Sequence, residues 1–140
     1  MNRKIQAAID YFRLNVTAIQ LVEESYSSTV RILWLTSGEK LVLKLPFNRN
    51  KVKREQKILT LLQGRLPVPR LIDCWLGNDE IPGALLLSYL PGASVKGAMT
   101  PNDCYAMGEL LARLHMVKTA GFGDDYEQVS DASAWRQMFI

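Results

Sequence analysis

The sequence has few features of secreted, membrane or metal-binding proteins. Its 140 residues include only two cysteines, Cys74 and Cys104, whose spacing does not match a metal-binding pair or a disulfide framework. No apolar run is long enough to cross a bilayer. The first residues, "MNRKIQAAIDYF", are polar and helical in pattern, unlike the apolar segment of a signal peptide. We therefore expect a reduced, cytoplasmic protein with no membrane partner.

The excess of one sign of charge is also small, because the sequence contains 17 Lys and Arg and 14 Asp and Glu, for a net charge of +3. This value alone does not indicate nucleic acid as a partner. One basic run lacks interleaved aromatic residues, and such a run usually forms the solvated face of a helix. Its members are Arg49, Lys51, Lys53, Arg54 and Lys57. A basic binding module is an alternative, but we expect no nucleic-acid partner.

Alternating and apolar segments predict a sheet preceded by a helix. Four residues at helical spacing near the start indicate an amphipathic helix: Ile5, Ala8, Ile9 and Phe12. Five strand-like segments follow it: 18–24, 30–35, 40–45, 70–76 and 84–90. Short connections favour an antiparallel arrangement of the first three, and the almost wholly apolar fifth segment is expected to be buried.

Helical patterns interrupt and follow these strands. Residues 51–62 read as a helix inserted after the third strand, and the prolines of "LPVPRL" end it. Thr100, Pro101 and Asp103 have the spacing of an N-cap, a first helical residue and a capping-box acid. An apolar stripe continues this helix through Met107, Leu110, Leu111 and Leu114. A last short helix is expected from Trp135. The chain is thus α+β, with a boundary near 91–98 that separates residues 1–92 from 93–140.

Two charged residues stand in apolar surroundings. Lys44 lies in the strand "KLVLKL", and Glu55 falls between Val52 and Ile58 on the apolar stripe of the inserted helix, which also includes Leu59 and Leu62. A carboxylate on a core-facing stripe is costly unless it is paired. We therefore expect Lys44 and Glu55 to form an ion pair that could hold the lysine against a polyphosphate. Alternatively, Lys44 faces solvent on a half-buried strand and Glu55 reaches water at the edge of its stripe.

The ordered motifs resemble a known family. "LVLKL", "REQKILTLL", "LPVPRLI" and "ALLLSYLPG", followed by "GELLARLH" and "GFGD", are similar to the N-terminal lobe and next segment of aminoglycoside phosphotransferases. These are small-molecule kinases, and the resemblance covers nearly the whole chain. It implies a protein-kinase-like N-lobe, with a five-stranded antiparallel sheet and one inserted helix. It also implies that residues 93–140 begin an incomplete C-lobe.

The resemblance assigns roles to individual positions. Lys44 would contact the nucleotide α- and β-phosphates, and Glu55 would be its helix partner. Ser27 and Ser28, in the loop "SYSST" from Ser25 to Thr29, would cover the phosphates. Val42 would pack on the purine, and the hinge Ser88, Tyr89 and Leu90 would bond its edge through the Ser88 carbonyl and Leu90 amide. Further walls would be Leu21, Val30, Ile72 and Leu87.

The sequence departs from the family pattern in two places. "SYSST" contains no glycine, so an ordinary polar hairpin is an alternative to a phosphate-covering loop. His115 is followed by "MVKTA", without the Asp of an H-x-D-type catalytic loop, and Asp124 and Asp125 match a linker rather than a magnesium motif. No catalytic or metal-binding residue is therefore assigned in this chain.

These features lead to two functional interpretations. The first is a truncated or fragmentary small-molecule kinase, whose complete parent would use ATP or GTP with Mg²⁺ to phosphorylate a hydroxyl of an aminoglycoside or similar metabolite. The second is a non-catalytic kinase-like module that binds nucleotide or a partner protein. We expect weak or no nucleotide binding by this chain alone. We also expect self-association through the Met107–Leu114 helix, whose apolar stripe lacks a partner in the sequence.

Overall fold

The computed structural model describes residues 2–22, 26–93, 95 and 97–119. The chain divides into two compact units, Met1–Ser94 and Val95–Ile140, and each is described by itself. The helix expected from Trp135 and the acidic residues Asp124 and Asp125 lie outside the described residues.

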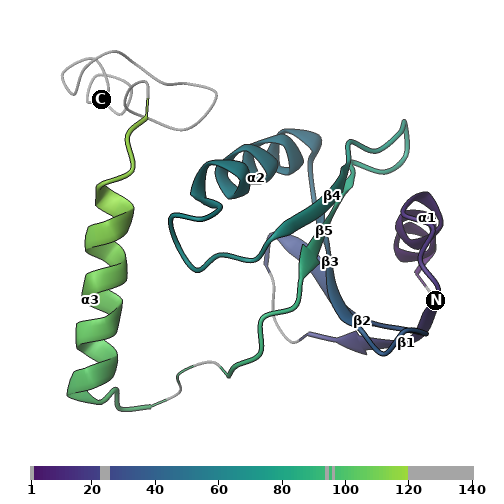
Figure 1. Cartoon of the computed structure of the whole chain (residues 1–140). Helices are drawn as coiled ribbons and strands as arrows, with labels where there is room; N and C mark the ends of the chain where they lie inside the picture. Colours follow the sequence, from purple (N-terminus) through teal and green to yellow (C-terminus); the bar gives the residue numbers. More distant parts are fainter. Residues whose placement is uncertain (1, 23–25, 94, 96, 120–140) are drawn as a thin grey trace. The chain divides into compact units, whose positions relative to one another are not determined.

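The first unit contains a five-stranded antiparallel sheet in the order β1-β2-β3-β5-β4 (Figure 1). Its strands are β1 (Val16–Leu21), β2 (Ser28–Leu35), β3 (Lys40–Pro46), β4 (Leu71–Trp75) and β5 (Ala84–Ser88). Helix α1 (Arg3–Tyr11) precedes the sheet, and α2 (Arg49–Leu62) follows β3. The predicted α+β class, antiparallel sheet and inserted helix are confirmed.

Strand pairing extends β2 further than the sequence predicts. The strand begins at Ser28 rather than at Val30, because Ser28 and Thr29 pair with Pro46 and Leu45 of β3. The prediction that both residues belong to a loop is therefore wrong. Pairing with a long neighbouring strand outweighs the turn preference of serine, and the β-branched Thr29 suits an extended conformation.

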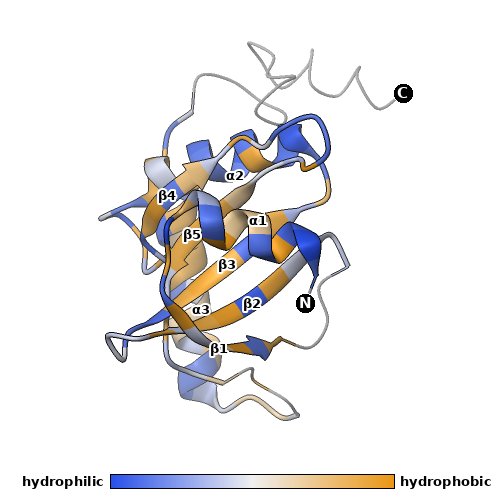
Figure 2. Cartoon of the chain, turned by 90° about the vertical axis from the view of Figure 1, so that its right-hand side faces the viewer, coloured by the Kyte–Doolittle hydropathy of each residue, from blue (hydrophilic) through white to orange (hydrophobic). Residues whose placement is uncertain are grey.

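The register of β3 gives the sheet two different faces. On the α1 face, Leu43 and Leu45 pack with Leu33 of β2 and with Ile5 and Ile9 of α1. All five side chains are buried. Strand alternation places the three leucines on one side of the sheet, and the i,i+4 spacing of Ile5 and Ile9 places both on one face of α1. Figure 2 shows how strongly hydrophobic the strands of the sheet are. Burial of this apolar surface holds α1 on the sheet.

The α2 face is only partly apolar. Val52 of α2 is buried against Leu85 and Leu87 of β5, and Val42 and Leu59 pack around them. The predicted stripe of α2 is correct at Val52 and Leu59, but Ile58 is 41% exposed and does not belong to this cluster. The remaining positions of the α2 face carry the charged and polar side chains of the site described below.

The second unit contains α3 (Pro101–His115). The Thr100 side chain accepts a hydrogen bond from the Asp103 amide, and the Asp103 carboxylate accepts bonds from the Thr100 amide and hydroxyl at 2.9 and 2.7 Å. The predicted capping box is therefore present. None of the residues of α3 is buried.

No helix within the described ranges is both long and apolar enough to cross a membrane.

Candidate functional site

The predicted pair of Lys44 and Glu55 is present on the α2 face. The Lys44 ammonium lies 2.8 Å from Glu55 Oε2, and the two side chains are only 28% and 19% exposed. Lys44 comes from the central strand β3, which pairs with β2 and β5 on its two sides. The lysine is thus fixed by a rigid element and by a partly desolvated carboxylate.

Local features of α2 explain why Glu55 points toward the sheet. The Asn48 side chain caps the helix by accepting a hydrogen bond from the Lys51 amide at 2.8 Å. Val52 and Leu59 pack on the sheet, and Glu55 lies three residues after the first and four before the second. Residues with this spacing share one helical face, so packing of the valine and leucine also directs the carboxylate inward.

A second lysine, which the sequence analysis left outside the site, also contacts this carboxylate. The Lys51 ammonium lies 3.9 Å from Glu55 Oε1 and donates a hydrogen bond to the Ser27 carbonyl at 3.2 Å. Its side chain is 24% exposed. The i,i+4 spacing of Lys51 and Glu55 was the available sequence signal, but the contact with Ser27 arises only from the tertiary fold.

Apolar side chains adjoin the charged pair along the same face. Val42 pairs with Ile32 of β2 and with Leu87 of β5, while Lys44 pairs with Val30 and Leu85. Directly opposed residues of an antiparallel sheet share a face, so Val30, Val42 and Leu87 lie on the side of the pair. This is the surface on which the resemblance places the purine ring.

Two residues expected to extend this surface do not lie there. Leu21 pairs with Arg31, which pairs with Leu43 of the α1 face, so Leu21 belongs to the opposite side of the sheet. In β4, Leu71 rather than Ile72 packs beside Leu87, because the register is irregular between Leu71 and Asp73. Neither the end of β1 nor this irregularity was visible in the alternation of the sequence.

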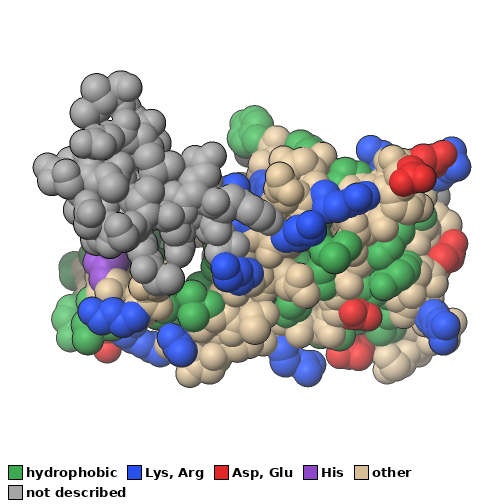
Figure 3. Space-filling model, turned by 90° about the horizontal axis from the view of Figure 1, so that it is seen from above, with side chains coloured by type: hydrophobic (Ala, Val, Ile, Leu, Met, Phe, Trp, Pro, Cys, Tyr) green, Lys and Arg blue, Asp and Glu red, His purple; other side chains and the backbone are tan. Residues whose placement is uncertain are grey.

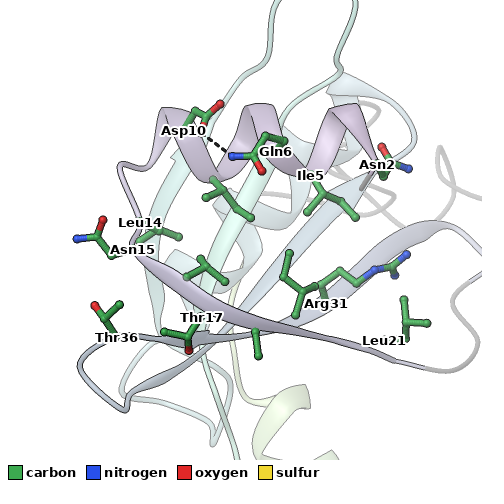
Figure 4. Close-up of a pocket in the computed structure, with 14 residues that line it drawn as sticks. Asn2, Ile5, Gln6, Asp10, Leu14, Asn15, Thr17, Leu21, Arg31 and Thr36 are labelled. Atoms are coloured by element: carbon green, nitrogen blue, oxygen red, sulfur yellow. Dashed lines mark hydrogen bonds between the residues drawn. The ribbon is translucent and has the colours of Figure 1, made fainter.

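Leu21 instead borders a cavity of about 870 Å³ between α1 and β1. Figure 4 shows this hollow on the α1 face, with Ile5 above it, Arg31 along its floor and Leu21 at one end. The Gln6 amide donates a hydrogen bond to Asp10 along the helix at 2.7 Å. The cavity and the Lys44–Glu55 pair therefore lie on different sides of the sheet.

The two serines expected above the phosphates have different environments. Ser27 is exposed, and its carbonyl accepts bonds from Lys51 and from the Phe47 amide at 3.2 and 3.4 Å. Ser28 is 2% exposed, and its hydroxyl has no hydrogen-bond partner among the described residues. The register places Ser28 opposite Pro46, on the same face as Lys44. A buried hydroxyl without a partner is uncommon in folded proteins and destabilises the strand end.

The predicted hinge begins at Ser88, the last residue of β5, and continues into the two residues after the strand. The Ser88 amide donates to the Arg70 carbonyl at 2.9 Å, and the Ser88 hydroxyl accepts from the Arg70 amide at 2.8 Å. The Tyr89 ring lies near Lys40, whose ammonium is 5.1 Å from the Tyr89 centroid and 4.0 Å from that of Trp34. Leu90 is 51% exposed. These two hydrogen bonds to Arg70 fix the start of this segment beside Val42 and Leu87.

A thiol lies under the apolar part of the α2 face. Cys74 pairs with Leu85 and packs against the cluster around Val52. Burial raises the pKa of the Cys74 thiol above its ordinary value, and the neighbouring Asp73 charge raises it further. A raised pKa and packing against this cluster are typical of a structural cysteine rather than of a nucleophile.

The basic run does not form one uniform solvated surface. Arg49 donates hydrogen bonds to the carbonyls of Asn78 and Pro82, and Lys51 turns toward Glu55 and Ser27. Figure 3 shows basic, acidic and hydrophobic side chains interspersed on the surface viewed from above Figure 1. Among the described residues, no group of three His, Cys, Asp or Glu side chains is arranged to hold a metal ion.

Comparison with known proteins identifies the family of this chain. The model of the phosphotransferase enzyme family, APH, matches residues 18–139. The chain belongs to the phosphotransferase enzyme family.

Solved structures support the same fold. Eleven of their chains match, among them a macrolide 2′-phosphotransferase type I. That protein is similar with a TM-score of 0.51 and 22% sequence identity, over 81% of this chain and 42% of its own chain. This chain thus corresponds to less than half of that structure's length. A search of curated proteins found no significant match. The α+β, kinase-like fold implied by the sequence resemblance is confirmed.

Proposed function

We propose that this chain supplies the nucleotide-binding lobe of an ATP- or GTP-dependent small-molecule kinase. The Lys44–Glu55 ion pair is the observation that carries this proposal, because it holds a cation at a defined position on a partly desolvated face. In the complete protein, the acceptor would be a hydroxyl of an aminoglycoside or a similar metabolite. Membership of the phosphotransferase enzyme family supports this reaction class.

The site residues fit a nucleotide in one orientation. Val42 and Lys44 lie on the same face of β3 two residues apart, a separation of about 7 Å in an extended strand. A purine packed on Val42 and Leu87 would therefore direct its phosphates toward Lys44 and the exposed Ser27. The Ser88 carbonyl and the Leu90 amide would bond the purine edge.

Each residue would contribute one interaction to the bound nucleotide. The Lys44 ammonium would attract the α- and β-phosphates, and Glu55 would keep that ammonium from turning away. Ser27 would present its hydroxyl to the phosphates, whereas the buried Ser28 would hold the start of β2 near them. A magnesium ion bound with the nucleotide would neutralise phosphate charge. No residue of this chain is assigned to that ion, because the sequence lacks the motifs that supply its ligands in the family that it resembles.

The proposal is tested by titrating the chain with ATP and magnesium and measuring the changes in NMR chemical shifts. We expect weak binding, with the largest shifts near Val42, Lys44 and Ser88. Lys44→Ala should weaken this binding about tenfold or more, because it removes the charge that meets the phosphates. Lys53→Ala serves as the control, because it removes an exposed lysine of the same helix that belongs neither to the ion pair nor to the core. Tight binding that Lys44→Ala leaves unchanged would refute the site.

A phosphotransfer assay separates this proposal from the non-catalytic alternative. The chain itself contains no H-x-D-type motif after its single histidine, His115. We therefore expect no ADP release from ATP and aminoglycosides by these 140 residues. A longer parent protein that contains this lobe is expected to transfer phosphate. A parent that binds ATP without transferring it would favour the non-catalytic module.

We also propose that the apolar stripe of α3 contacts a second copy of the chain. Four large apolar side chains of this helix are 38–57% exposed, namely Met107, Leu110, Leu111 and Leu114. Exposed apolar surface of this kind favours association. Light scattering over increasing protein concentration should show a growing mass, and Leu111→Glu should abolish the growth. A monomer at every concentration would contradict this contact.

A further inference from the structure

Lys51 occupies an unusual position for a lysine in the first turns of a helix. Its side chain is 24% exposed, whereas lysines are normally among the most exposed residues. The ammonium lies between Glu55 Oε1, at 3.9 Å, and the Ser27 carbonyl, at 3.2 Å. It therefore connects the carboxylate of the candidate site with the residue immediately before β2.

From this geometry we propose that Lys51 is a positioning residue of the nucleotide site. It anchors the Ser27 backbone to α2, and it holds the free side of the Glu55 carboxylate while Lys44 occupies the other oxygen. The inference rests on the proposed function, because it assigns to this anchor the task of presenting Ser27 to nucleotide phosphates.

Charge arithmetic supports a role beyond packing. Lys44 and Glu55 alone form a neutral pair, which attracts a polyphosphate weakly at a distance. With Lys51 the cluster contains two cations and one anion, for a net charge of +1. When the Lys44 ammonium also binds a phosphate, Glu55 still has Lys51 as a second cationic partner. A partly buried carboxylate that retains a partner avoids the cost of an unpaired charge.

The chain offers well-matched variants for a test. Lys51→Met removes the ammonium but keeps a long side chain, and Lys51→Arg restores a cation that can donate to both partners. Lys53→Met makes the same charge change at an exposed position two residues along α2. The Phe47 amide donates a hydrogen bond to the Ser27 carbonyl at 3.4 Å, and none of the three substitutions removes either group, so exchange of this amide reports on the anchor.

Amide hydrogen exchange without nucleotide provides the first measurement. We expect Lys51→Met to accelerate exchange at Phe47 and Thr29 about threefold or more, because local opening becomes easier when the anchor is lost. Lys51→Arg should return exchange to the wild-type rate, and Lys53→Met should leave it unchanged. Equal exchange in Lys51→Met and wild type would overturn the anchor, whatever the chain binds.

Paired titrations with ATP and adenosine provide the second measurement. Lys51→Met should weaken ATP binding about threefold to tenfold and leave adenosine binding unchanged, because the anchored segment faces only the phosphates. Equal loss for both ligands would overturn this phosphate-specific role. If the wild-type chain binds neither ligand, the same titrations are made on a longer parent protein that contains this lobe. Absence of binding there would overturn the proposed function, and hydrogen exchange still decides whether Lys51 anchors Ser27.

Discussion

The two faces of the sheet are built from the same strands but have different chemistry. On the α1 face, Leu33, Leu43 and Leu45 pack against apolar side chains of α1, and all are buried. On the α2 face, equivalent positions of β3 hold Val42 and Lys44, and α2 contributes Glu55. One face therefore resembles an ordinary core, while the other retains charges that a core normally excludes.

This difference indicates that the α2 face is not optimised for stability. An ion pair that is partly desolvated contributes little net stabilisation, and a buried hydroxyl without a partner, as at Ser28, is unfavourable. Departures from good packing concentrate at functional sites. The contrast between the faces therefore supports the assignment of the site independently of the family match.

Truncation of the α1 face should have the largest effect on stability. Leu43→Ala removes a side chain that is 0% exposed, and we expect a loss of about 2–5 kcal/mol in the free energy of unfolding. Leu21→Ala, at a position 71% exposed, should change it by less than about 0.5 kcal/mol. Urea denaturation measures both. Similar losses for the two leucines would contradict the claim that the α1 face holds the main core.

Changes at the ion pair should have a smaller effect that depends on which charges remain. Glu55→Gln leaves two partly buried ammonium groups without their carboxylate, and we expect a loss of about 1–2 kcal/mol after allowing for partial exposure. Lys44→Met combined with Glu55→Leu should recover part of this stability, because apolar side chains replace both charges of the pair while Lys51 still lacks its carboxylate partner.

The double variant sharpens the comparison because it makes the α2 face resemble the α1 face. Urea denaturation should find it more stable than Glu55→Gln, while NMR titration should detect no ATP binding. If the double variant is instead much less stable than Glu55→Gln, the pair is required for folding. The charges would then be a structural feature rather than a sign of function.

The smallest effect is expected in α3, whose end is held by local hydrogen bonds. Bonds from the Thr100 hydroxyl and then the Thr100 amide lower the pKa of Asp103 below its ordinary value of 3.8. A lowered pKa means that the ionised carboxylate stabilises the folded helix. This stabilisation is present above pH 3.8 and is lost as the pH falls through the lowered pKa.

Amide exchange of α3 between pH 2 and 5, corrected for the intrinsic pH dependence, measures this effect. Protection in the first turn should decrease toward the acidic end in wild type. Asp103→Asn lacks the titrating group and should show a flat profile over this range. A wild-type profile as flat as that of Asp103→Asn would show that the capping box contributes nothing.

Much of this architecture follows from the sequence because it depends on local patterns. Alternation in β3 and helical phase in α2 made Lys44 and Glu55 candidate partners, with solvent-facing side chains as the alternative, and the structure contains this pair at 2.8 Å. Thr100, Pro101 and Asp103 likewise specify the start of α3 through interactions within one turn. Each of these features involves a repeat or spacing that the chain itself displays.

Features that depend on pairing between distant segments were not predictable in this way. Ser28 became part of β2 because β3 extends to Pro46, and Leu21 faces α1 because of its register with Arg31. Lys51 was missed for the same reason, since the Ser27 carbonyl that it contacts is 24 residues away in the chain. Register and loop closure are properties of the assembled sheet rather than of any single segment.

The alternation of β3 has a consequence for how the gene can vary. Leu43 and Lys44 are neighbours in sequence but serve opposite faces, one in the core and one in the site. Inserting or deleting a single codon within β3 would exchange these roles along part of the strand. Point substitutions at this strand therefore damage one face at a time, whereas a one-codon change in length would disable both. Lineages that carry this domain should vary in length at the connections between strands and keep β3 constant.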